Sequence, residues 1–124
     1  MLSLLAPMVT AAPDALVTHN QTEVYANAFM SGVASPFPTA PHTDGRVNWF
    51  LIRLACMGHI EGGFCKSTIK VTEVAGPTDA YVTEIGEIGV DVDTGMIEPR
   101  VIQANGFQLK IDGPGEATLT QMNK

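Results

Sequence analysis

The residues best able to do chemistry lie around the chain's two cysteines. Cys56 and Cys65 are separated by eight residues, and His59 and Glu61 lie between them. An imidazole and a carboxylate can bind a metal ion, but a protein metal site needs three or four convergent ligands. Because only two such ligands are close in the sequence, His59 and Glu61 are weak metal candidates. We expect no cofactor and no metal site, and interpret His59 as a solvated loop residue.

A second chemical pattern is the triplet Asp93-Thr94-Gly95, which follows an apolar stretch. It resembles the catalytic triplet of aspartic proteases. The length of 124 residues would also suit a homodimeric retroviral-type protease, in which two such aspartates share a proton. The resemblance covers three residues, and the chain ends soon after them. Since Asp and Gly are also favoured turn residues, we expect a hairpin turn at this position.

Other catalytic motifs are absent from the sequence. No serine lies in a G-x-S-x-G elbow, and there is neither a G-x-G-x-x-G pattern nor a phosphate-binding loop. A disulfide would consume both thiols, which removes the cysteines as nucleophiles. The sequence therefore favours a protein that is not an enzyme.

The charge of the chain argues against several classes of partner. Acidic residues number 13 against 7 basic ones, which gives a net charge of −6. The basic residues are scattered, whereas binding a phosphate backbone needs several convergent cations. We therefore expect no nucleic-acid binding and no attraction to an anionic membrane. No stretch is long enough to predict an integral membrane protein.

The spacing of apolar residues predicts a hairpin over Val47–Val74. Antiparallel pairing that sets Cys56 opposite Cys65 also sets Ile52 opposite Ile69, with apolar side chains on one face. A buried helix over Val47–Met57 is the alternative, because a short apolar run cannot be assigned by periodicity alone. Residues such as Trp49 and Ile52 favour the strand. The hairpin predicts a disulfide between the two cysteines.

A disulfide indicates an oxidising compartment, so we expect a secreted or periplasmic protein. The N-terminal stretch is ambiguous: Leu2–Val9 is apolar and Val9-Thr10-Ala11 resembles a signal-peptidase site, but no Lys or Arg precedes it. We interpret residues 1–14 as an N-terminal arm or edge strand and residues 15–124 as a single β domain.

The remaining segments read mainly as short strands joined by turns. Residues 20–32 fit either a helix or a strand, with a slight preference for the strand. Three prolines make Ala34–Gly45 a crossover loop between sheets. Asn105-Gly106 predicts a tight hairpin, and the threonine-rich Glu116–Met122 predicts an edge strand. The pattern indicates a mainly β protein, an antiparallel β-sandwich of six to eight short strands. An immunoglobulin-like arrangement is one form of such a sandwich. A small β-barrel is the alternative fold.

Three functional hypotheses follow. The first is a non-enzymatic secreted or periplasmic β domain that binds a protein or ligand partner through loops or an edge strand. The second is a self-assembling structural subunit of a surface or particle lattice, in which the N-terminal arm and the edge at Glu116–Met122 pair between chains. The third is a small hydrolase centred on Asp93 or His59.

Overall fold

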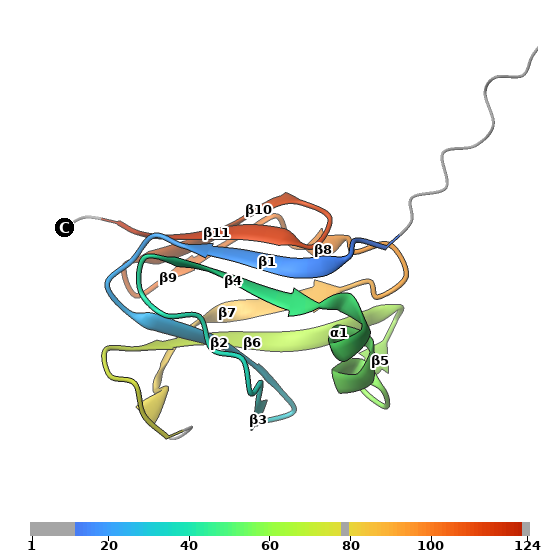
Figure 1. Ribbon diagram of the computed structural model, residues 1–124, viewed down its shortest axis with the longest axis horizontal. Helices are drawn as coiled ribbons and strands as arrows, with labels where there is room; N and C mark the ends of the chain where they lie inside the picture. The colour runs from blue at the N-terminus through green and yellow to red at the C-terminus, as the bar shows by residue number, and fades with distance from the viewer. Residues whose placement is uncertain (1–11, 78–79, 123–124) are drawn as a thin grey trace, which may run out of the picture.

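Two β-sheets face each other in this computed structural model, which describes residues 12–77 and 80–122 (Figure 1). Sheet A contains, in spatial order, β4 (Thr43–Asn48), β1 (Ala15–Asn20), β11 (Glu116–Gln121), β10 (Phe107–Gly113) and β9 (Val101–Ala104). Sheet B contains β3 (Val33–Ala34), β2 (Tyr25–Met30), β6 (Phe64–Thr72), β7 (Thr83–Val90) and β8 (Ile97–Glu98), with β5 (Ile60–Glu61) beside β6. One helix, α1 (Trp49–Cys56), follows β4.

The predicted mainly β sandwich is confirmed, and the barrel alternative is wrong because the two sheets remain separate. The described residues form eleven strands rather than six to eight, since several strands are only two residues long. The sheets are also not purely antiparallel: β1 pairs with β11 in parallel. No helix in the described ranges is long and apolar enough to cross a membrane.

Alternating burial builds the core between the sheets. On β6 the inward residues are Cys65, Ser67, Ile69 and Val71, while Lys66 on the opposite face is exposed. The same period of two places alternate side chains of β10 and β11 against the facing sheet. The sequence's alternation of apolar and polar residues is therefore what fixes which face of each sheet is buried.

Several local predictions are confirmed. Asn105-Gly106 connects β9 to β10 with the expected register, in which Ala104 lies opposite Phe107. Within the ambiguous residues 20–32, the strand is correct, since Tyr25–Met30 forms β2. The proline-rich segment crosses from β3 in sheet B to β4 in sheet A, as expected for a crossover loop.

The predicted Val47–Val74 hairpin is wrong, and the helix that the sequence left as the alternative is present. Asn48 ends β4 and caps α1, its side chain accepting a hydrogen bond from the Phe50 backbone N–H at 2.8 Å. Trp49 and Cys56 are buried on one side of the helix, a separation of seven residues that fits helical periodicity. Helix formation prevailed because a good N-cap precedes this apolar spacing.

The prediction that Glu116–Met122 is an edge strand is also wrong. β11 lies in the middle of sheet A, between the parallel β1 and the antiparallel β10. Its threonines occupy the outer face, while Ala117 and Leu119 face the core, where Leu119 is fully buried. A strand paired on both sides cannot pair with a second chain, so this basis for self-assembly is lost. The other proposed pairing segment, residues 1–9, lies outside the described residues.

Candidate functional site

His59 and Glu61 belong to no cluster of three or more potential metal ligands among the described residues. The His59 Nδ1 atom lies 3.1 Å from the Ser31 hydroxyl oxygen, so this nitrogen is engaged in a hydrogen bond. Glu61 lies on the short strand β5 and is exposed to solvent. The structure instead groups His19, Asp112 and Glu116, whose ligand atoms all lie within 4.8 Å of one another.

The group around His19 is better described as an ion-pair bridge across three strands. The His19 Nε2 atom lies 2.6 Å from a Glu116 carboxylate oxygen on β11, and Nδ1 lies 2.8 Å from an Asp44 carboxylate oxygen on β4. The hydrogen bonds to Glu116 and then to Asp44 raise the pKa of His19 above its usual value of 6.5. Because both ring nitrogens are occupied, the imidazole would have to give up a carboxylate partner to bind a metal.

Asp93 lies in an exposed turn after β7. Its carboxylate is 3.3 Å from the Arg53 guanidinium on α1. The neighbouring Asp91 carboxylate accepts hydrogen bonds from the backbone N–H groups of Asp93 and Thr94 at 2.9 and 3.3 Å, and Gly95 takes a positive φ of 82°. The triplet thus has the hydrogen bonds of the turn predicted from sequence.

A cavity of about 490 Å³ lies between the two sheets. Side chains of both sheets line it, together with α1 and the crossover segment before β4. The lining from sheet A includes Leu16, Thr18, Val47, Leu109, Ala117 and Leu119, and the lining from sheet B includes Ala26, Ala28, Met30, Ser67, Ile69, Ile88 and Val90. Among the described residues, no Asp, Glu, Lys or Arg side chain lines this cavity and His59 is its one titratable member, so the space suits a mainly hydrocarbon occupant.

Small residues at inward positions create this space. In sheet A, Thr18 and Ala117 are direct neighbours on β1 and β11. Gly45 pairs with Thr18 on β4 and leaves room for Thr39, whose side chain a Cβ at Gly45 would meet at 2.5 Å. Across the cavity, β2 contributes Ala26 and Ala28 where a sandwich core would accommodate larger side chains. A core of large side chains normally packs without such voids, so the row of small residues leaves a cavity rather than a filled interior.

The cavity opens at the side of the sandwich where β4 and the β2–β3 pair form the sheet edges. Its lining residues Val33, Phe37 and Leu51 are also exposed to solvent, which locates the opening between the β3–β4 segment and α1. Figure 1 shows α1 projecting below the end of β4, with β3 on the same lower side of the molecule. The helix and the crossover segment are therefore the two walls of the opening.

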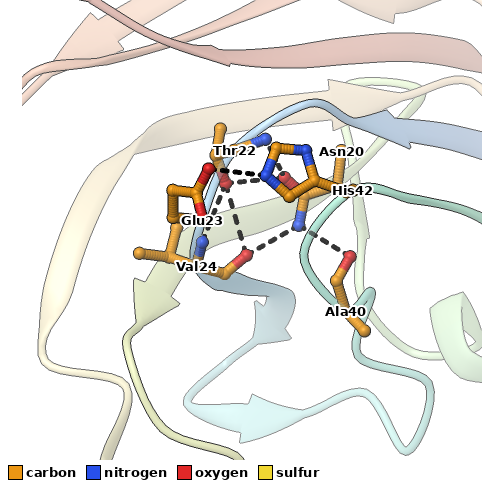
Figure 2. A network of polar contacts seen from close by, with 6 residues as sticks. All are labelled: Asn20, Thr22, Glu23, Val24, Ala40 and His42. Atoms are coloured by element: carbon orange, nitrogen blue, oxygen red, sulfur yellow. Dashed lines mark hydrogen bonds and ion pairs between the residues drawn. The ribbon is translucent and has the colours of Figure 1, made fainter. Parts of the chain in front are cut away.

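A buried asparagine fixes the crossover wall. The Asn20 side-chain amide donates hydrogen bonds to the backbone carbonyls of Val24, Thr39 and Ala40 at 2.8, 3.2 and 3.1 Å. Its carbonyl oxygen accepts from the Thr22 backbone N–H and hydroxyl. Figure 2 shows this network without Thr39, together with the neighbouring His42–Glu23 contact of 2.6 Å between two exposed side chains. Asn20 thus joins the end of β1 to the start of β2 and to the crossover segment.

A disulfide fixes the helical wall. Cys56, the last residue of α1, is bonded to Cys65 on β6, with 5.7 Å between their Cα atoms. Sequence reasoning identified this pair, although it assigned the wrong local structure to Cys56. It missed the cavity, for which the available signal was the run of small residues Ala26 and Ala28 at alternate positions of a strand facing the core.

The fold and the site define the class of protein: a disulfide-bonded β-sandwich with an apolar cavity open between its sheets. The chain belongs to the family of the type II secretion system substrate NttC, whose family model matches residues 1–122. It is therefore a secreted protein, in agreement with the compartment predicted from the cysteines.

A solved relative shares the fold. The crystal structure of the Legionella pneumophila type II secretion system substrate NttC superimposes with a TM-score of 0.79 at 40% sequence identity, covering 89% of this chain and 99% of that chain. No curated protein matches the sequence.

Proposed function

We propose that this secreted protein is a binding module that holds an apolar small molecule in the cavity between its sheets. The observation that carries the proposal is the cavity itself. Its volume of about 490 Å³ lies within the range of small-molecule sites, roughly 300–1,000 Å³.

The lining supports an apolar occupant with little polar character. Burying its hydrocarbon against Ile69, Leu109 and Leu119 would remove apolar surface from water on both sides of the contact. Thr18 and Ser67 also line the cavity, and their hydroxyls are groups with which a polar atom of the ligand would hydrogen-bond.

Filling the cavity tests the proposal. We would titrate the protein with a dansyl-labelled fatty acid and follow energy transfer from Trp49, the only tryptophan, on the helix beside the opening. Saturable binding by the unmodified protein is expected. The double variant Ala28→Leu/Ala117→Leu should bind at least about tenfold more weakly, because its added side chains occupy the ligand's space.

A matched control separates occupancy from general disturbance of the sheet. Thr120→Leu adds a leucine to the outer face of the same strand β11 and should leave the affinity unchanged. Equal affinities for the unmodified protein and the filled variant would show that the probe binds elsewhere.

A further inference from the structure

Exposed apolar side chains border the opening of the cavity and continue onto the outer face of α1. We name this set the apolar rim: Val33, Phe37, Phe50, Leu51, Leu54 and Met57, with exposed fractions from 38% to 69%. Exposed patches of this kind on a secreted protein mark sites of interaction with a partner or a lipid surface.

Helical geometry connects the rim to the cavity. Phe50, Leu54 and Met57 follow one another at spacings of four and three residues, so they lie on one stripe of α1 and its last turn. Leu51 lies three residues before Leu54 and also lines the cavity. The apolar surface therefore continues from the outer stripe of the helix into the interior of the sandwich.

Few charged residues occur in the two segments that form the walls of the opening. All 13 acidic residues lie outside segments 30–41 and 49–60, which form the two walls of the opening. The only residue with a permanent charge in those segments is Arg53, whose guanidinium is paired with Asp93. The rim thus has almost no net charge on a molecule whose net charge is −6.

We propose that the apolar rim docks on a zwitterionic phospholipid bilayer and that the cavity takes up an acyl chain from it. This inference rests on the proposed function and names the source of its ligand. A neutral apolar surface gains energy by entering the bilayer interface, while the acidic remainder of the molecule would be repelled from an anionic one. Because Val33, Phe37 and Leu51 of the rim also line the cavity, a chain would enter it from the docked surface without crossing water.

Other occupants fit the rim less well. A protein partner seated on the rim would cover the opening and close the cavity to exchange. A second copy would do the same, since its own rim would face the first.

Vesicle flotation tests the docking step. The unmodified protein should float with phosphatidylcholine vesicles, and the triple variant Phe50→Gln/Leu54→Gln/Met57→Gln should partition at least about tenfold more weakly, because burial of even one large apolar side chain is worth about that factor. The control Val74→Gln/Val82→Gln/Val101→Gln removes exposed valines outside the rim and should float like the unmodified protein.

Uptake tests the second step separately. The residues of the triple variant do not line the cavity, so it should still bind the dissolved dansyl fatty acid while accepting a dansyl-labelled chain from vesicles more slowly. Failure of the unmodified protein to float would overturn the docking step even if the dissolved probe binds. Flotation that depends on the rim, without any probe binding, would overturn the uptake step together with the proposed function.

Oligomeric state distinguishes the remaining rival. A rim-dependent dimer in sedimentation velocity, combined with no flotation, would overturn the proposal in favour of a second copy as the occupant.

Discussion

Cys56 on α1 and Cys65 on β6 are covalently joined, so the helix that forms one wall of the cavity opening is tied to sheet B. The sulfur of Met30 on β2 lies 3.3 Å from that of Cys65, which packs a third element against the bridge. The helix has only eight residues, and isolated helices of that length are marginal in water. Its position therefore depends on this bond and on the burial of Trp49.

Removing the bridge should lower stability by a modest amount. The two cysteines are nine positions apart, and closing a loop of that length in the unfolded chain accounts for about 2–3 kcal/mol. We expect Cys56→Ala/Cys65→Ala to reduce the free energy of unfolding by that amount in urea titrations. Reductant should destabilise the unmodified protein and leave the variant unaffected. Equal free energies of unfolding for the variant and the unmodified protein, both measured without reductant, would contradict the prediction.

The His19 bridge predicts a dependence of stability on pH. Hydrogen bonds to Glu116 and Asp44 raise the pKa of His19 in the folded state above 6.5. Its contribution should therefore be fully present below the unfolded value and be lost as the pH rises through the raised folded value. We expect the unmodified protein to lose stability as the pH rises above about 6.5, the value for an unperturbed histidine.

A variant isolates this effect from other titrations. His19→Gln should have a flatter profile over the same range, and the two profiles should converge at high pH. Because the Asp44 side chain is largely exposed and the Glu116 side chain about half exposed, the difference should be small and should decrease with added salt. Parallel profiles would show that His19 has the same pKa in the folded and unfolded chains.

The alternation of apolar residues was enough to predict the sandwich, because burial of one face determines most strands of this fold. It also gave the register at Asn105-Gly106, where the turn residues select the geometry. The apolar pattern gave the wrong structure at Trp49–Cys56, because this apolar run fits both a strand and a helix. A hairpin that set Cys56 opposite Cys65 also matched the apolar pattern, and this agreement favoured the strand. The decisive signal was Asn48, a helix-capping residue directly before the run.

The cavity and the central position of β11 depend on pairings that are far apart in sequence. β11 pairs with β1, about one hundred positions away, and the small residues Gly45, Thr18 and Ala117 become neighbours only through that pairing. Alternation shows that a residue faces inward but not which residues lie beside it. The site therefore could not be assembled from the sequence.

Asn20 provides a sharp test of the crossover wall. Asn20→Asp replaces an amide that donates to the carbonyls of Val24, Thr39 and Ala40 with an oxygen that faces the same acceptors. We expect the free energy of unfolding to fall by about 3 kcal/mol or more, because buried donors are lost and a buried charge is unpaired. Acidification that protonates the new carboxylate should recover part of the loss.

The same substitution at an exposed cap is the control. Asn48 only accepts a hydrogen bond at the start of α1, a role that aspartate fills equally well. Asn48→Asp should change stability by less than about 0.5 kcal/mol. Similar effects at the two positions would show that the Asn20 amide does not hold the crossover segment.

Two glycines with nearly the same backbone conformation separate steric crowding from backbone strain. Gly58 has φ of +83° and Gly95 has φ of +82°, but a side chain at Gly58 would meet no atom within 4 Å, whereas a Cβ at Gly95 would lie 2.5 Å from the Pro13 ring. Gly58→Ala should destabilise by about 1 kcal/mol from strain alone. Gly95→Ala should destabilise by at least about 1 kcal/mol more, because the proline ring is rigid and cannot rotate away. Equal losses in urea titrations would mean that the segment bearing Pro13 moves aside freely, so that this part of the chain is not packed against the turn.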